Sequence, residues 1–264
     1  MQVYSINNGY NSKPNFKSWS REVTKKTFIG KVLQYEVIKH RNDSWFFRNA
    51  DIWPTLTEYL IERFKNVTKV NVYSYGCSDG SEPFSFVMRM LSAHPQQASK
   101  FLPVIAKDYD KEAINKVEKR EYYTIKDLEK KDINFCTNNS FNRFFSIIDS
   151  GPAMTFAFAK NELYDNVRFS VADINCDYKK IEPNNSVVFV RNFWPYIEKW
   201  SDRQKLLKNI GNQLGENSFL IIGAFDRKGT NWTIDNQVVE AGFKRTIVDY
   251  VFEKNIGEEG NICK

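Results

Sequence analysis

The amino-acid sequence predicts an α/β fold with a doubly wound, mostly parallel sheet, similar to the Rossmann fold. Three observations support this prediction. Short apolar strands alternate with helical segments, a glycine-containing loop follows the first strand of that series, and polar residues follow the ends of later strands. We also expect a small β element inserted in the sheet domain and a short helical segment at the N-terminus.

Residues 1–40 are predicted to form a basic, partly helical N-terminal segment. Apolar residues between Arg21 and His40 recur loosely at helical spacing, which indicates one helix. A second helix is expected from Asp51 to Phe64. Asp51 would cap it, and Pro54 would lie in its first turn, where the missing N–H donor costs little.

Residues 41–264 are predicted to form a single domain that carries the sheet, because the sequence shows neither an internal repeat nor a low-complexity linker. Strands are expected at Val70–Tyr75, Val104–Lys107, Val167–Val171, Val187–Val190 and Phe219–Gly223, helices near Glu82–Ser92, Lys111–Lys119 and Asp202–Leu214, and a hairpin-like strand pair within Phe243–Phe252. The alternation breaks near 122–166. This stretch indicates a helical connection followed by the inserted β element.

The composition disfavours a membrane-spanning protein, a metal site and a histidine-dependent hydrolase. Hydrophobic residues make up 42% of the chain, yet no apolar run approaches the roughly 20 residues that cross a bilayer. No signal-peptide core is seen, so we expect a cytoplasmic protein without membrane insertion. The four cysteines lack metal-ligand spacing and are expected to be reduced, with no metal site. Only two histidines are present, which disfavours Ser-His hydrolysis and His-rich metal sites.

The net charge is unevenly distributed. Within residues 1–50, nine Lys or Arg face three acids, which accounts for the whole net charge of +6. Such a segment suits an acidic protein surface or nucleic acid. A solvated helical face would show the same pattern.

The loop from Gly76 to Gly80 is the most informative feature of the chain. Glycines let backbone amides approach a ligand, and a strand–loop–helix unit places that ligand beyond the carboxyl ends of a parallel sheet. Glu82, at the expected helix start, suits a cofactor with a cationic end and disfavours a bare polyphosphate. S-adenosylmethionine carries an ammonium and a sulfonium, and it meets that demand.

Acidic residues follow the next two strands. Asp108 can accept both ribose hydroxyls, whereas Asp110 is expected to cap the following helix. The separation of Asp108 from the glycine loop exceeds the roughly 20 residues of the dinucleotide fingerprint, so an NAD site fits poorly. Asp173 can accept the adenine amino group while the next backbone amide, that of Ile174, donates to a ring nitrogen. A plain turn residue would explain Asp173 equally well.

The fourth strand is followed by Arg191 and Asn192, and then by aromatic residues and a proline. A charged and an amide side chain at this point are typical of a ligand wall, because a buried arginine needs a partner. Phe193 and Trp194 are also consistent with core positions. The segment from Asn42 to Arg48 is, by itself, no more than an amphipathic turn.

Taken in order, these segments resemble the S-adenosylmethionine-binding domain of the chemotaxis-receptor protein-glutamate O-methyltransferases. The matches are Asn42, Ser44, Phe46, Phe47 and Arg48 before the sheet, Gly76 through Ser85, Asp108 and Asp110, and Val190, Arg191, Asn192 and Tyr196. The resemblance runs from about residue 40 to the end. The N-terminal helical domain of the family is about twice as long as the segment available here. Ser81 and Phe84 replace a glutamate and a tyrosine of the pattern, and Asp173 stands where the family usually has Asn.

The resemblance implies a role for each matched residue. The implied cofactor contacts are Asn42, Ser44, Arg48, Gly76, Glu82, Asp108, Asp173, Ile174, Arg191 and Asn192. Arg48 and Tyr196 would lie near the reactive methyl group and act in catalysis. Since a glutamate acceptor is already ionised at neutral pH, no strong base is needed, in keeping with the scarcity of histidine.

The implied function is methylation of a glutamate carboxylate on an acidic protein, such as a chemoreceptor-like helix. Two alternatives remain open. The Asn192–Tyr196 segment superficially resembles the loop on which amino-group methyltransferases stack a flipped base, so nucleic acid or another acceptor is conceivable. The chain could also be a non-catalytic module that binds S-adenosylmethionine.

Overall fold

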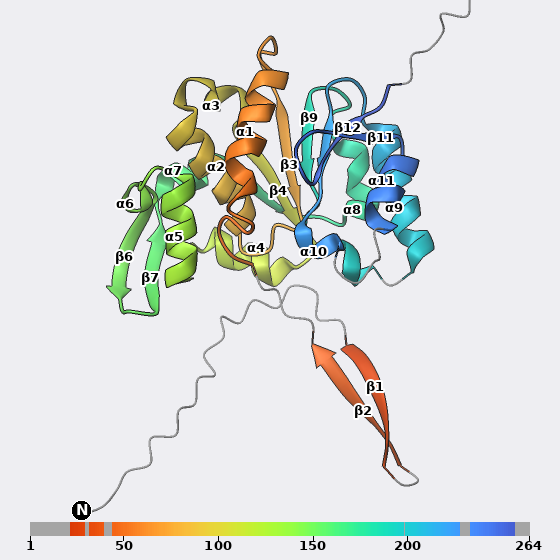
Figure 1. The fold of residues 1–264 in the computed structure, drawn as a ribbon. Helices are drawn as coiled ribbons and strands as arrows, with labels where there is room; N and C mark the ends of the chain where they lie inside the picture. The colour runs from red at the N-terminus through yellow and green to blue at the C-terminus, as the bar shows by residue number, and fades with distance from the viewer. Residues whose placement is uncertain (1–21, 30–31, 40–43, 198, 228–232, 257–264) are drawn as a thin grey trace, which may run out of the picture.

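A computed structural model describes residues 22–29, 32–39, 44–197, 199–227 and 233–256. Its centre is a seven-stranded sheet with the order β11-β12-β10-β9-β3-β4-β8 (Figure 1). The strands that pair in parallel are β3 (Asn71–Tyr75), β4 (Val104–Asp108), β8 (Val167–Val171), β9 (Ser186–Phe189) and β10 (Phe219–Ile221). Strand β12 (Val251–Lys254) runs antiparallel between β10 and β11 (Phe243–Arg245). The fold class predicted from the sequence is confirmed.

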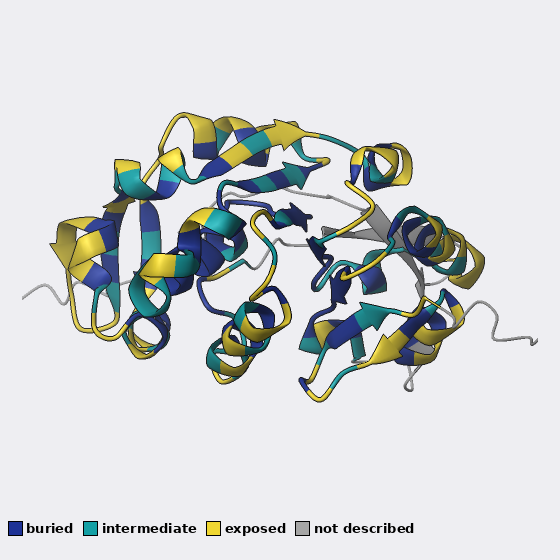
Figure 2. Ribbon diagram, turned by 90° about the horizontal axis from the view of Figure 1, so that it is seen from above, coloured by how far each residue is buried: buried dark blue, intermediate teal, exposed yellow. Residues whose placement is uncertain are grey.

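Helices cover both faces of this sheet, and alternate residues of the strands face opposite sides. Val187 and Phe189 of β9 belong to one core cluster, together with residues of α1 (Ile52–Arg63) and α2 (Ser81–Ala93). Val188 of the same strand packs with α9 (Trp200–Gln213) and α11 (Thr233–Glu240) on the other side. A sheet covered on both faces needs apolar residues at successive positions. The central strands are accordingly buried along their length (Figure 2).

Shorter elements connect these layers. They are α3 (Pro95–Phe101), α4 (Lys111–Glu118), α7 (Asn161–Asp165), α8 (Ile174–Asp177), the 3₁₀ turns Tyr178–Lys180 and Trp194–Tyr196, and α10 (Ala224–Arg227). Asp110 caps α4 as predicted, accepting from the Glu112 and Ala113 amides. Asp51 occupies the cap position of α1, but its side chain makes no capping hydrogen bond, so that prediction was wrong.

The inserted unit follows α4. It consists of β5 (Tyr123–Lys126), α5 (Asp127–Cys136), α6 (Phe141–Phe144), β6 (Phe145–Ser150) and β7 (Met154–Ala159). The three strands form an antiparallel sheet of order β5-β7-β6. The predicted helical connection and β element are both present, and strand β5 of that element precedes the helical connection.

The predicted helix between Arg21 and His40 was wrong. Strands β1 (Glu22–Ile29) and β2 (Val32–Lys39) pair antiparallel in this stretch. Their sequences contain many β-branched and aromatic residues, which favour strands. This composition outweighs a spacing that was only loosely helical.

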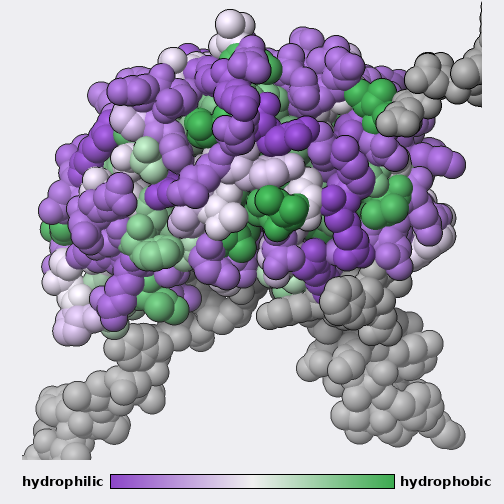
Figure 3. All heavy atoms as spheres, turned by 45° about the horizontal axis from the view of Figure 1, so that its top comes forward, coloured by the Kyte–Doolittle hydropathy of each residue, from purple (hydrophilic) through white to green (hydrophobic). Residues whose placement is uncertain are grey.

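Other sequence expectations can be compared with the described part of the chain. Cys77, Cys136 and Cys176 are free. Within the described residues, no group of three or more His, Cys, Asp or Glu side chains is arranged to hold a metal ion. None of the described helices combines the length and the apolar character that a membrane span requires. The face shown in Figure 3 is largely hydrophilic, with scattered hydrophobic side chains.

Candidate active site

One pocket lies beyond the carboxyl ends of the parallel strands. Its lining includes Gly76 after β3, Asp108 at the end of β4, Ala172 after β8 and Arg191 after β9. The order of the sheet reverses at β3, which has β4 on one side and β9 on the other. Such a switch point is where open α/β sheets bind ligands. The space within the pocket is about 970 Å³, a volume that includes open solvent.

The glycine loop forms one wall of the pocket. Gly76 and Gly80 have φ of 72° and 83°, in the left-handed region that glycine adopts without a steric penalty. A Cβ on Gly80 would also lie 3.0 Å from the ring of Phe169. The loop leads directly into α2, so Glu82 enters the pocket from the first helical turn.

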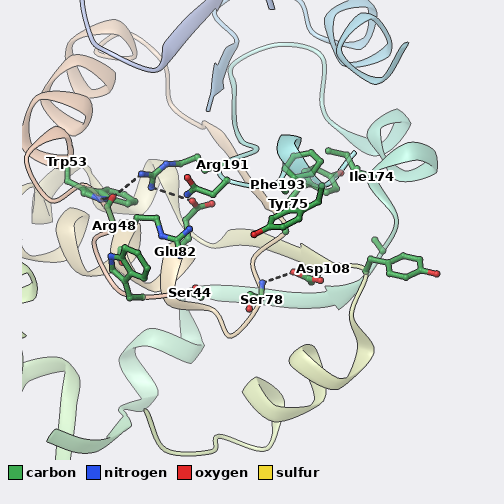
Figure 4. A pocket seen from close by; sticks show the side chains of 17 residues that line it. Ser44, Arg48, Trp53, Tyr75, Ser78, Glu82, Asp108, Ile174, Arg191 and Phe193 are labelled. Carbon is green, nitrogen blue, oxygen red and sulfur yellow. Dashed lines mark hydrogen bonds and ion pairs between the residues drawn. The ribbon is translucent and has the colours of Figure 1, made fainter. Parts of the chain in front are cut away.

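Glu82 is held between a hydroxyl and a guanidinium. Its Oε1 accepts from Ser74 Oγ at 2.9 Å, and its Oε2 lies 3.4 Å from Arg191 Nη1. Its side chain is 17% exposed, whereas that of Arg191 is 1% exposed. Burial raises the pKa of Glu82, and the neighbouring Arg191 opposes that rise. The arrangement keeps one carboxylate facing the pocket in a fixed position (Figure 4).

Arg48 lies beside Glu82, on a strained turn. Phe47 and Asn49, which flank it, have φ of 49° and 60°, and a left-handed conformation at a bulky residue costs about 1–2 kcal/mol. The Arg48 guanidinium stacks on Trp45, with Cζ 3.9 Å from the ring centroid. Burial lowers the pKa of Arg48, and the charge of Arg191 lowers it further.

Several contacts hold this turn in place. The Arg48 carbonyl accepts from Arg191 Nη2 at 2.9 Å and from Trp53 Nε1 at 3.2 Å. The Phe47 amide donates to Ser85 Oγ at 2.8 Å, and the Phe46 amide donates to Glu129 Oε1 at 2.7 Å. The strained backbone is thus fixed from α1, α2, the β9 loop and the inserted unit.

Asp108 lies at the opposite end of the pocket, across Tyr75 from Arg48 and Glu82 (Figure 4). Its Oδ2 accepts from the Ser78 amide at 2.7 Å and its Oδ1 from the Asp110 amide at 2.8 Å. Burial raises the pKa of Asp108 to about 6. The pocket therefore has a carboxylate at each end.

The loop after β9 forms the remaining wall and is held by a buried carboxylate. Asp226 of α10 accepts from the amides of Asn192 at 2.7 Å, Trp194 at 3.2 Å and Gly223 at 2.6 Å. Burial raises the pKa of Asp226 to about 7. These contacts bring Asn192 and Tyr196 to the pocket, with Asn192 at a φ of 62°.

The structure gathers most of the residues predicted from the sequence around this one pocket. They are Ser44, Arg48, Gly76, Glu82, Asp108, Ile174, Arg191, Asn192 and Tyr196. Asp173 is the exception: it is not among the lining residues, and its Oδ1 accepts from the Asn175 amide at 2.9 Å, as the cap of α8. Asn42 lies outside the described residues.

Sequence reasoning missed other lining residues. The pocket is also lined by Trp45, Trp53, Tyr75, Ser78, Ser85 and Tyr109. Phe193 lines it too, and it also packs against a core cluster. Ser85 follows Glu82 by three positions, so helical spacing could have placed both on one face of α2. Trp194 is fully buried, in keeping with a core position.

The buried acids give a pH prediction. In the unfolded chain, carboxyl groups release their protons near pH 4, whereas folding raises the pKa of both Asp226 and Glu129 to about 7 through burial. Between these values the folded state binds more protons, so stability falls as the pH rises from about 4 to about 7. We expect a lower thermal midpoint at pH 8 than at pH 6. Glu129→Gln should reduce this difference, and a midpoint that rises with pH would contradict the prediction.

The strand order, the glycine loop and the acid at the end of the second parallel strand define the class of Rossmann-like methyltransferases. The family model for the CheR methyltransferase SAM-binding domain matches residues 42–239, more than half of the chain. The chain belongs to this family, whose model describes an S-adenosylmethionine-binding domain. The cofactor predicted from the sequence is confirmed.

The sequence identity to an individual relative is low. The chain is similar to Chemotaxis protein methyltransferase 2 of Vibrio cholerae serotype O1, with 24% identity over 187 residues that cover 69% of this chain and 61% of the relative. It therefore spans less than two thirds of that relative's length.

One similar solved structure is a TehB-like SAM-dependent methyltransferase from Corynebacterium glutamicum, which is 14% identical in sequence. The match covers 78% of this chain and 96% of that chain, with a TM-score of 0.36. Another is the N-methyltransferase NodS from Bradyrhizobium japonicum, with 12% identity, coverage of 78% and 97%, and a TM-score of 0.39.

Proposed function

We propose that the protein transfers the methyl group of S-adenosylmethionine to a glutamate carboxylate on an acidic, receptor-like protein. One observation carries the proposal: a single pocket places the Arg48 guanidinium beside a fixed carboxylate, Glu82, with a second carboxylate, Asp108, at the far end. The family supports methyl transfer, and the relative in Vibrio cholerae is by name a chemotaxis methyltransferase.

The charged groups of the pocket suit this cofactor. Glu82 would bind the ammonium group, with Gly76 along the methionine chain and Asp108 accepting from the ribose hydroxyls. Ile174 would contact adenine, and Ser44, Asn42, Arg191 and Asn192 would complete the cofactor wall. For Asp173 we propose an indirect role, because its carboxylate caps α8, whose first residue is Ile174.

We propose that Arg48 and Tyr196, which both line the pocket, form its acceptor end. Among the described residues, no carboxylate lies within 4.0 Å of the Arg48 guanidinium, so its donors are available to an incoming carboxylate. A planar guanidinium can orient a glutamate by two parallel hydrogen bonds.

The proposed reaction needs no general base among these residues. The cofactor supplies an electrophilic methyl group on a sulfonium. The glutamate acceptor is an anion at neutral pH, so no residue has to remove a proton from it. The protein's part is to align the carboxylate and to keep water out, and such alignment contributes several kcal/mol.

The inserted sheet offers a place for the rest of such an acceptor. Strand β6 lies at the edge of that sheet, and Ile147 and Ile148 on it are exposed. An edge strand can pair with an extended peptide. We propose that a receptor segment docks there. Such a receptor-methylating enzyme would work in the cytoplasm.

The decisive assay uses methyl-labelled S-adenosylmethionine and a purified cytoplasmic fragment of a chemoreceptor. We expect label in the fragment that mild alkali releases as methanol, because carboxyl methyl esters are base-labile. A fragment with its methylatable Glu residues changed to Gln is the matched control and should stay unlabelled.

Two further arms separate the alternatives. Duplex DNA, single-stranded DNA and RNA are offered as acceptors at low and high salt, because nucleic-acid binding weakens steeply with salt. Alkali-stable label on nucleic acid would replace the proposed acceptor. Tight cofactor binding without label in any acceptor would indicate a non-catalytic binding module.

A further inference from the structure

The turn that carries Arg48 is held by a residue of the inserted unit. Glu129, in the first turn of α5, accepts the Phe46 amide at 2.7 Å although it lies 83 positions further along the chain. Arg48 follows Phe46 by two residues and lines the pocket. The contact therefore acts on the backbone of the short turn that carries Arg48 to the pocket.

Glu129 is buried, although it lies in the first turn of a helix and accepts a hydrogen bond at the helix start. Only 8% of the residue is exposed, and it lies against a cluster in which Phe46 packs edge-on against Tyr123 and Phe145, with ring centroids 5.1 Å apart in both pairs. Burial of a carboxylate is unfavourable unless it is hydrogen-bonded. Its contact with the Lys126 amide at the start of α5 is the longer of the two, at 3.3 Å.

A second contact ties the inserted unit to the pocket. The Tyr123 hydroxyl donates to the carbonyl of Asp79 in the glycine loop at 2.7 Å. Two residues of the inserted unit thus hold the two segments that present Arg48 and Glu82. The same unit exposes strand β6 at its edge, so one element both faces solvent and supports the site.

We propose that Glu129 is a positioning residue, which sets the place of Arg48 through the Phe46 amide. The inserted unit is, on this account, a structural part of the catalytic pocket. The inference rests on the proposed function in so far as Arg48 acts on the acceptor. Its structural half, that Glu129 holds the 44–50 turn, does not depend on the acceptor.

The structural half is tested by amide hydrogen exchange, measured without any acceptor. Glu129→Asp keeps the charge at the helix start but is one methylene shorter, and Glu129→Met keeps the length but cannot accept. We expect exchange within residues 44–50 to quicken at least tenfold in both variants. Glu129→Gln, which retains an acceptor oxygen, should stay within threefold of the parent protein. If exchange changed within 127–136 alone, Glu129 would be a helix cap and the inference would fall.

The functional half is tested by a double-mutant cycle on kcat/KM for methyl transfer. Glu129→Asp should lose at least tenfold by itself, yet should change activity less than twofold in an Arg48→Ala background, because residues that act through one group are not additive. Full additive loss in the double variant would overturn the inference. Glu162→Gln, in α7 just after the inserted unit and in a surface pair with Arg143 of α6, is the control expected to leave activity unchanged.

The outcomes distinguish the two proposals. If no acceptor is labelled but exchange responds as described, the proposed function fails and the positioning role stands. If Glu129→Met does not fold, the hydrogen-exchange test and the double-mutant cycle both use Glu129→Asp. Normal exchange in 44–50 in a folded Glu129→Asp protein contradicts the inference whatever the enzyme methylates.

Discussion

Replacing Glu82 by Gln is expected to weaken S-adenosylmethionine binding by roughly 10- to 100-fold. A hydrogen bond to a charged group contributes about 1.5–3 kcal/mol, and each 1.4 kcal/mol is a factor of ten in the dissociation constant. Gln keeps the length of the side chain and can still accept from Ser74 Oγ, but it offers no negative charge to an ammonium group.

The same substitution should also lower the thermal midpoint. Arg191 is almost fully buried, and Glu82 is its carboxylate partner in the described structure. Loss of one member of a buried ion pair leaves an uncompensated charge and is strongly destabilising. Here the remaining contacts of Arg191, to the Arg48 carbonyl and to Asn49, should limit the loss.

Calorimetric titration of the folded variant with S-adenosylmethionine measures the effect on binding. Asp108→Ala should also weaken binding, because it removes the carboxylate at the other end of the pocket and the acceptor of the Ser78 amide. Glu62→Gln, in a surface ion pair with Lys65, is the matched control. Equal affinity in Glu82→Gln, Asp108→Ala and the parent protein would contradict the assignment of the site.

The sheet could be predicted from the sequence because its signals are local. Strand β10 is apolar throughout and β9 is apolar after Ser186, and the loop between β3 and α2 contains glycines that have left-handed backbone angles. Residues after such strands must meet at one sheet edge, so Glu82, Asp108 and Arg191 could be assigned to a shared pocket before any geometry was known. Their placement follows from topology.

What escaped prediction depends on contacts between distant residues. Nothing near Glu129 in the sequence indicates that it accepts the amide of Phe46, and Asp226 likewise holds a loop more than thirty positions away. Asp173 shows the opposite problem, because a carboxylate after a strand looks the same in sequence whether it binds a ligand or caps a helix. The N-terminal strands were missed because a loose helical spacing was preferred to β-branched composition.

Arg48→Ala is expected to lower kcat for methyl transfer by about 100-fold or more, with a smaller effect on cofactor affinity. Removal of one preorganised hydrogen-bond donor from an active site typically costs 10²–10³ in kcat. Glu82 is already paired with Arg191, whereas the Arg48 guanidinium lines the pocket with its plane stacked on the Trp45 ring. The guanidinium is thus placed to act on an incoming carboxylate.

Arg48→Lys separates charge from geometry. Lysine keeps the positive charge but cannot make two parallel hydrogen bonds or stack as a plane on Trp45, so its kcat should lie well below that of the parent protein. Arg143→Lys, in an exposed pair with Glu162, controls for the substitution itself. Single-turnover rates and calorimetric affinities should be measured on the same preparations. If Arg48→Ala impaired cofactor binding and left the single-turnover rate of saturated enzyme intact, Arg48 would belong to the cofactor site alone, and another group would have to orient the acceptor.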